Sequence, residues 1–238
     1  MKKSIVLATA IASVLASGAA SAELSANAGV ASNYIWRGVT QTNDQAAGWG
    51  GIDYGHDSGL YAGTWVSNVA FGTETGGGYE MDVYAGFAGE AGGLGYDIGV
   101  ITYQYPVAPS TNFTEVYASG TFSLVTVGVA YTADAASGNE NAPFDSGDLY
   151  VNASVDFGAG DSDISVYAGS YMFDCDGTSG AEACGEVDYS HFGASISKDG
   201  FSFAMDKNDI SDEHIFAYDD GSSDNVRFTV SYTKDFEL

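Results

Sequence analysis

The chain has 238 residues, with 32 acidic residues against seven lysines and arginines, and a formal net charge of −25 at pH 7. This balance excludes nucleic acid as a partner, because neutralising phosphate groups requires lysine and arginine. The 32 glycines and three prolines, with tyrosine and phenylalanine far outnumbering tryptophan, are typical of many short strands and turns.

The first 22 residues have the pattern of a secretory signal peptide. Two lysines precede an apolar run from Ile5 to Leu15, and the A-x-A motif Ala20-Ser21-Ala22 follows. We therefore expect residues 1–22 to be cleaved and residues 23–238 to form one domain. No later stretch approaches the roughly 18 consecutive apolar residues of a membrane helix. Export across the inner membrane is expected, without retention there as a helical protein.

The mature chain contains about 12 strand-like segments, most with the roughly 9 to 11 residues that a tilted membrane strand needs. The clearest pair runs from Tyr79 to Val100, where apolar side chains alternate with acidic or small ones on both sides of a glycine-rich turn. This alternation predicts one face toward lipid and an acidic face toward the lumen of a β-barrel. The expected strands are about 24–36, 45–55, 60–69, 79–88, 94–104, 113–122, 124–132, 148–157, 163–173, 186–196, 201–206 and 226–236.

The expected connections alternate strictly between long and short. The long ones are 37–44, 70–78, 105–112, 133–147, 174–185 and 207–225, and the short ones are 56–59, 89–93, 123, 158–162 and 197–200. Outer-membrane barrels have short periplasmic turns and longer extracellular loops, and an even strand number returns both termini to the periplasm. A soluble secreted β-sandwich has no reason to sort its loops in this way.

The sequence therefore predicts an all-β fold, a single up-and-down antiparallel transmembrane β-barrel in the outer membrane of a Gram-negative bacterium. Both termini are expected in the periplasm, and outer-membrane lipid is an expected partner. Aromatic residues at the expected strand ends fit the girdles that such barrels carry at the membrane interfaces. These residues are Tyr34, Trp36, Tyr131, Phe157 and Phe236.

A small repeat, tyrosine followed by alanine and a small residue, recurs in the expected strands. Its copies begin at Tyr61, Tyr84, Tyr117 and Tyr167. In the last three copies the tyrosine and the small residue share the lumen face, so each ring is expected to lie over a glycine of a neighbouring strand. A ladder of rings that stacks on a ligand is the alternative.

The two cysteines, Cys175 and Cys184, lie in one long polar connection that is expected on the outside. An oxidising compartment favours a disulfide between them, and a two-cysteine metal site is the alternative. Asp174 and Asp176 in the same connection, and Asp219 with its neighbours in the last one, offer oxygen ligands for Ca²⁺. No complete twelve-residue calcium loop is present, so solvated acidic loops and no cofactor are expected.

Charged residues on the expected lumen face are mostly acidic. The predicted pore-lining residues are Arg37, Glu80, Asp82, Asp97, Glu115, Asp148, Asp156, Asp163, Asp188, Asp206 and Arg227. Carboxylates that line a pore raise the local concentration of cations and repel anions. The alternative is that these acids only solvate the interior. For Arg37 we expect a salt bridge to an acidic lumen residue, with direct substrate binding as the alternative.

No catalytic site is expected, so the protein is interpreted as a non-enzyme. His56, His191 and His214 do not converge in the sequence, and no serine hydrolase signature or Walker loop is present. A barrel phospholipase would need a serine and a histidine on the lipid-facing side, whereas His191 falls on the lumen face.

Four motifs stand close together in the first third of the chain: SNYIWRGVTQT at 32–42, GIDY at 51–54, GLYAG at 59–63 and WVSN at 65–68. Together they resemble the TorF-type porin family, described as a conserved hypothetical proteobacterial outer-membrane domain. The likeness is dense from about residue 32 to 121 and looser beyond. It implies a porin-like outer-membrane protein, with no substrate or catalytic residue to transfer. The C-terminus departs from the usual ending, because Glu237 and Leu238 follow Phe236.

The expected function is passive passage of small solutes or cations through a narrow acidic lumen. Barrels of about eight strands are filled by side chains and those of about 16 leave an aqueous channel, so 12 strands allow a pore that a loop or a few tyrosines could block. The alternative is a non-conducting barrel whose acidic, ion-binding loops serve contacts at the cell surface.

Overall fold

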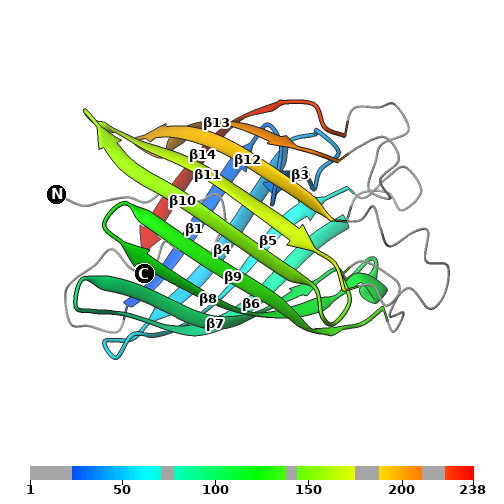
Figure 1. Ribbon diagram of the computed structural model, residues 1–238, viewed down its shortest axis with the longest axis horizontal. Coiled ribbons are helices and arrows are strands. Elements are labelled where there is room, and N and C mark those ends of the chain that lie inside the picture. Colours follow the sequence, from blue (N-terminus) through cyan, green and yellow to red (C-terminus); the bar gives the residue numbers. More distant parts are fainter. Residues whose placement is uncertain (1–22, 71–77, 138–143, 175–187, 211–222) are drawn as a thin grey trace.

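The strands expected from the alternation form a closed antiparallel barrel in the computed structural model, which describes residues 23–70, 78–137, 144–174, 188–210 and 223–238 (Figure 1). Each of the 12 barrel strands pairs with its neighbours along the chain, and β1 closes the barrel by pairing with both β14 and β4. The strands are β1 Glu23–Ala31, β4 Ala47–Gly55, β5 Leu60–Val69, β6 Gly78–Ala91, β7 Leu94–Gln104, β8 Phe113–Phe122, β9 Val125–Ala135, β10 Leu149–Ala159, β11 Ser162–Met172, β12 Tyr189–Lys198, β13 Phe201–Asn208 and β14 Arg227–Glu237.

The two ends of the barrel differ in the length of their connections. The short turns between β4 and β5, β6 and β7, β8 and β9, β10 and β11, and β12 and β13 lie at one end, which we call the turn end (Figure 1). The long connections lie at the opposite end, the loop end. Ser25 pairs with Glu237, so β1 begins and β14 finishes at the turn end. The predicted alternation of long and short connections is confirmed.

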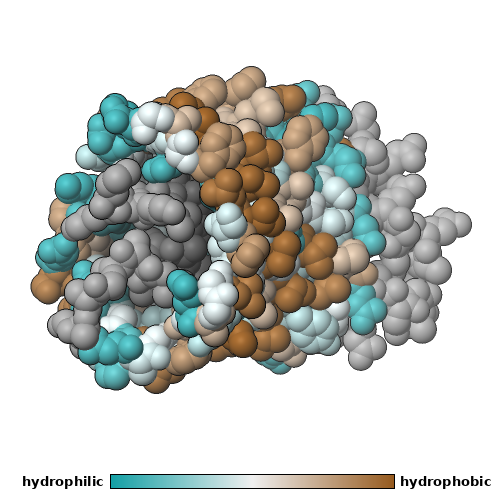
Figure 2. Space-filling view, turned by 60° about the vertical axis from the view of Figure 1, so that its left-hand side comes forward, coloured by the Kyte–Doolittle hydropathy of each residue, from teal (hydrophilic) through white to brown (hydrophobic). Residues whose placement is uncertain are grey.

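Apolar side chains form a belt on the outside of the barrel, and Figure 2 shows it on one face, between more polar residues. Each of its strands presents at least one large apolar side chain outward, among them Ile98 and Val30, both 59% exposed, and Phe228, 61% exposed. A soluble monomer rarely exposes so continuous an apolar surface. The belt therefore fits contact with the hydrocarbon of a membrane, as the period-2 alternation predicts. Among the described residues, no helix combines the length and the apolar character needed to span a bilayer.

The first strand is shorter than expected. The alternation predicts one strand over 24–36, but β1 ends at Ala31 and the chain turns inward to form a separate hairpin of β2 (Ile35–Trp36) and β3 (Val39–Thr40). Arg37 and Gly38 connect them with φ values of 48° and 79°. Positive φ at both central residues is what a type I′ turn requires, so the chain reverses within two residues.

Polar side chains hold the base of this hairpin. Asn33 Oδ1 accepts hydrogen bonds from the hydroxyls of Thr40 (2.6 Å) and Thr42 (3.0 Å). The backbone N–H of Gln41 donates to the Tyr34 carbonyl (2.7 Å). We call residues 33–45 the lumen hairpin. The expected long connection 37–44 therefore lies inside the lumen, and the expectation that Tyr34 and Trp36 belong to a membrane girdle is wrong. Tyr131, Phe157 and Phe236 do lie on the outer surface, 40 to 46% exposed.

Several predictions concern residues beyond the described ones. The proposed signal peptide (1–22), the Cys175–Cys184 disulfide with its metal alternative, and the acidic residues Asp176 and Asp219 all lie there. These predictions remain open. Within the described ranges, no group of three or more histidine, cysteine or acidic side chains is arranged to hold a metal ion.

Candidate functional site in the lumen

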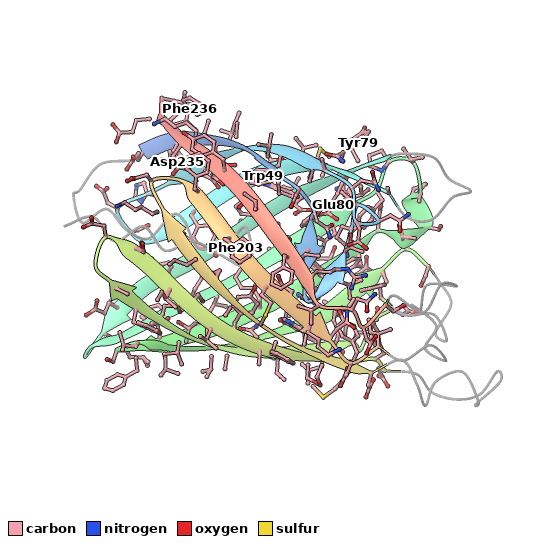
Figure 3. All side chains as sticks on the ribbon, turned by 90° about the horizontal axis from the view of Figure 1, so that it is seen from above. Trp49, Tyr79, Glu80, Phe203, Asp235 and Phe236 are labelled. Carbon is pink, nitrogen blue, oxygen red and sulfur yellow. The ribbon has the colours of Figure 1, made fainter. Side chains whose placement is uncertain are left out.

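The lumen hairpin crosses the inside of the barrel at the loop end and contacts strands on opposite sides. Tyr34 Oη donates to Glu80 Oε1 on β6 (2.7 Å), and Asn208 Nδ2 on β13 donates to the Gly38 carbonyl (2.8 Å). Arg227 Nε on β14 donates to Asp44 Oδ1 (2.9 Å). Figure 3 shows the two short blue strands within the outline of the barrel, with Glu80 near them. The hairpin therefore narrows this end of the lumen.

Arg37, at the tip of the hairpin, forms a buried bidentate ion pair with Glu115 on β8. Its Nη1 and Nη2 lie 2.7 and 2.6 Å from the two carboxylate oxygens, and the two side chains are 4% and 1% exposed. The guanidinium also lies over the rings of Trp36 (4.2 Å) and Tyr150 (4.1 Å). Burial lowers the pKa of Arg37, but the Glu115 carboxylate, together with Tyr171 and Tyr103, raises the pKa above its usual value. The predicted salt bridge is confirmed.

Aromatic rings clamp the hairpin beside this ion pair. The Trp36 ring packs on Tyr103 of β7 (5.7 Å between centroids), on Phe113 of β8 (6.2 Å) and on Tyr171 of β11 (6.1 Å). Phe144, from the connection before β10, closes the cluster from the loop end at 6.0 Å from Trp36. Gly38 is required where the tip meets β12, because a Cβ there would lie 2.4 Å from His191 Cβ. The loop end of the lumen is thus packed around the hairpin.

Three buried carboxylates lie near the lumen hairpin, two on β6 and one on β8. Glu80, Asp82 and Glu115 are 2%, 4% and 1% exposed. Glu80 accepts hydrogen bonds from the hydroxyls of Tyr34 and Tyr105, and Glu115 is paired with Arg37. Asp82 Oδ1 has no hydrogen-bond partner within the described part of the chain. The cluster therefore carries more negative than positive charge when its members are ionised.

Toward the turn end, tyrosines lie over glycines of neighbouring strands. A Cβ on Gly86, Gly63, Gly99 or Gly193 would approach within 2.3 to 2.6 Å of the rings or hydroxyls of Tyr61, Tyr84, Tyr117 and Tyr167 respectively. The predicted packing of the tyrosine repeat is therefore confirmed.

The hydroxyls of these tyrosines bind carboxylates on the lumen face. Tyr61 donates to Asp97 and Tyr167 donates to Asp206, both at 2.7 Å, and Tyr84 donates to Asp53. Because both the rings and the hydroxyls are already engaged by the barrel, the geometry favours packing over a ligand-stacking ladder.

Replacing Gly86 with alanine is expected to lower the free energy of unfolding by about 1–3 kcal/mol, the usual cost of overpacking. The new methyl group would meet the Tyr61 hydroxyl at 2.3 Å and the Ile98 carbonyl oxygen at 2.8 Å, and the latter belongs to the backbone. Urea unfolding of the refolded barrel measures the change. Gly158→Ala is the matched control, because nothing lies within 4 Å of its added Cβ; equal stability of the two variants would contradict the tyrosine-over-glycine packing.

The remaining predicted lumen residues occupy different environments. Asp148 is 1% exposed and its carboxylate accepts the backbone N–H groups of Asp145 (3.1 Å) and Asp174 (2.8 Å), so it joins two loop-end connections. Burial raises the pKa of Asp148 to about 7. Asp156 is half-buried and accepts the Ser154 hydroxyl (2.7 Å). Asp163 is exposed near the turn end.

Asp188 does not share the lumen face with the residues that follow it. It precedes β12, is exposed, and accepts the backbone N–H of Phe173 (2.8 Å), whereas Tyr189 and His191 are buried. In the period-2 pattern of β12, Asp188 falls on the face opposite to that of Tyr189 and His191. Asp53 belongs to the lumen set but is missing from the predicted one. Its alternation with exposed Ile52 and Tyr54 could have identified it.

The family model described as "Bacterial protein of unknown function (Gcw_chp)" matches residues 15–236. None of the curated proteins matches. Two solved porins share the fold. The KdgM porin is 11% identical, with a TM-score of 0.52 over 90% of this chain and 99% of that one, and the NanC porin is 10% identical, with a TM-score of 0.50 over 90% and 100%.

A third solved structure, the KdgM porin in complex with disordered oligogalacturonate, is 9% identical with a TM-score of 0.50. The likeness covers 91% of this chain and 99% of that one. At these identities the comparison concerns the barrel fold alone. Each of the three solved chains is matched over nearly its whole length, so the likeness extends to the complete barrel.

Proposed function

Since this chain belongs to the Gcw_chp family of bacterial proteins of unknown function, we propose from its own geometry that it is a porin-like channel of the outer membrane for small solutes or cations. The observation that carries the proposal is the closed barrel with an apolar belt outside and a polar, acidic lumen inside. The porin folds that it resembles support the same function. The resemblance of residues 32–68 to TorF-type porins supports it as well.

The charges on the lumen wall favour cations over anions. Arg37 is paired with Glu115 and Arg227 with Asp44, so the described arginines are each matched by a carboxylate. Glu80, Asp82, Asp97 and Asp206 then remain without a described ion pair. One related fold was solved with an oligogalacturonate, which is a polyanion. For this chain we propose the opposite preference, because a negatively charged lumen repels anions.

The orientation of the barrel in the outer membrane follows from the same proposal. Bacterial barrels keep short turns in the periplasm, so the turn end with both chain ends would lie there and the lumen hairpin would lie near the cell surface. A solute from outside would then meet the hairpin first. We propose that this hairpin sets the size limit of the channel.

Purified protein in a planar bilayer is expected to give small, discrete conductance steps. A salt gradient should produce a reversal potential of the sign that marks cation preference, because the lumen carboxylates without an ion pair carry negative charge when they are ionised. At about 1 M salt the Debye length falls to about 3 Å, so the preference should shrink. Anion preference, or a preference that does not respond to salt, would contradict the proposed role of the carboxylates.

The crossing of the lumen by the hairpin favours a second candidate, a non-conducting barrel that acts through its surface loops. The bilayer experiment separates the two. Absence of conductance at every voltage, in protein whose heat-dependent gel mobility shows that it is folded, would favour the second candidate.

A further inference from the structure

Asp82 differs from the other buried carboxylates of the lumen. It is 4% exposed, yet its Oδ1 has no hydrogen-bond partner and its carboxylate forms no ion pair among the described residues. Glu80 and Glu115, which are buried to the same degree, are both fully engaged. An ionised carboxylate without a partner in such a site costs several kcal/mol, roughly, unless something compensates it. The missing partner points to a bound group.

The neighbours of Asp82 indicate what kind of group would fit. Asp82 lies in β6 directly between Trp65 of β5 and Tyr103 of β7, which are its cross-strand partners on the two sides. Both rings are buried, 6% and 4% exposed. The lumen hairpin adds Tyr34, whose ring packs edge-on against Trp65 at 5.4 Å. A carboxylate flanked by tryptophan and tyrosine rings is a suitable environment for an ammonium group, which is attracted by the charge and by the ring faces.

The charges around Asp82 point the same way. The carboxylates of Glu80 and Glu115 both interact electrostatically with Asp82, and Arg37 compensates only Glu115 by direct pairing. Without a bound cation these neighbours favour the protonated, neutral carboxyl of Asp82, whereas a bound cation would stabilise the ionised carboxylate. The described residues contain no group of three donors arranged for a metal ion. An organic cation therefore fits better than a divalent metal.

We propose that Asp82, Trp65, Tyr103 and Tyr34 form a binding site for the ammonium group of a small organic cation, beneath the lumen hairpin. The inference deepens the channel function proposed above and rests on it, because the ligand must reach the site through the lumen. It assigns organic amines to the channel as their substrate class. Asp82 supplies a carboxylate that the bound ammonium group keeps ionised, and the three rings supply the surface over which the ammonium group and its methyl or methylene groups pack.

Calorimetric titration of the refolded full-length barrel with propylammonium and with tetramethylammonium tests the site directly. Both ions are expected to bind, and neutral propanol is not. Asp82→Asn should weaken binding roughly ten- to a hundredfold, as loss of a charge-assisted contact does. Asp53→Asn is the matched control, because Asp53 is also a buried lumen carboxylate but is already engaged by Tyr84 and Asn27. Its affinity for both ions should equal that of the unmodified protein.

A failure to bind either ion, or equal binding by Asp82→Asn, would overturn the inference. If Asp82→Asn does not fold, as shown by its gel mobility, Trp65→Leu replaces it. That variant should bind tetramethylammonium several-fold more weakly, and an unchanged affinity would overturn the site. Conductance without ammonium binding would contradict this inference but not the proposed channel function. Ammonium binding without conductance would contradict the channel function but not the binding site.

Discussion

Replacing Arg37 with methionine is expected to raise the single-channel conductance and to lower the free energy of unfolding by about 3–5 kcal/mol. The change leaves the Glu115 carboxylate buried without a partner, and it removes the two hydrogen bonds that attach the hairpin tip to β8. It also removes the packing of the guanidinium over Trp36 and Tyr150. The tip of the hairpin should then move, and the lumen should widen.

Urea unfolding in detergent and conductance in a planar bilayer measure the two effects. Lys207→Met is the matched control, since it breaks an ion pair with Asp224 in which both side chains are more than a third exposed. Surface pairs of this kind contribute at most about 1 kcal/mol. Lys207→Met should therefore leave both conductance and stability nearly unchanged.

The double variant Arg37→Met with Glu115→Gln separates the two effects. Replacing both partners of a buried ion pair is far less destabilising than removing one, because no buried charge is left unpaired. Stability should partly return, while the conductance should stay high because the attachment of the hairpin is still missing. Unchanged conductance in both variants would contradict the assignment of the hairpin as the constriction.

Replacing Val166 with arginine is expected to destabilise the inserted barrel by about 2–4 kcal/mol and to reduce its assembly in membranes. Val166 lies in the middle of β11 on the apolar belt and is 50% exposed, so an arginine there would meet hydrocarbon. The heat-dependent mobility of the protein after refolding into lipid vesicles measures the folded fraction.

The neighbouring position provides the control. Ser165 has the opposite orientation in the same strand and pairs across the sheet with Asp156, so an arginine at Ser165 would face the lumen beside a carboxylate. Ser165→Arg should fold nearly as well as the unmodified protein and should weaken the cation preference. Equal loss of folding in both variants would show that the exposed apolar belt is not the lipid-facing surface.

The sequence by itself determined the barrel. Because side chains alternate between two faces with a period of two, the segments around Val83, Ile98 and Val127 each specified which face is apolar, without knowledge of their neighbours. The alternation of long and short connections then specified strand pairing between consecutive segments and an even number of strands. These are local properties of the chain, and the expected strands agree with the observed ones within a few residues, except at the end of the first.

Part of the lumen site could also be predicted from the alternation of side chains between the two faces of each strand. Glu80, Asp82, Glu115 and Asp206 were assigned to the lumen face from their positions in strands, and each is buried. The packing of tyrosines over glycines followed from the same rule. Asp188 is the exception, because exposed and buried residues alternate from Asp188 onward and place it on the outer face with Phe192, opposite to His191. The prediction of Asp188 as a lumen residue is therefore wrong.

Only the tertiary structure decided that residues 33–45 fold into the lumen. The alternation of Tyr34 and Trp36 continues that of the first strand, so the local pattern does not distinguish an extended strand from an inward hairpin. The difference lies in contacts with distant parts of the chain. Arg37 meets Glu115 after 78 residues, and the Gly38 carbonyl meets Asn208 after 170. A buried charge at the hairpin tip is stable in the lumen only because the closed barrel places a carboxylate and a ring of aromatic side chains around it.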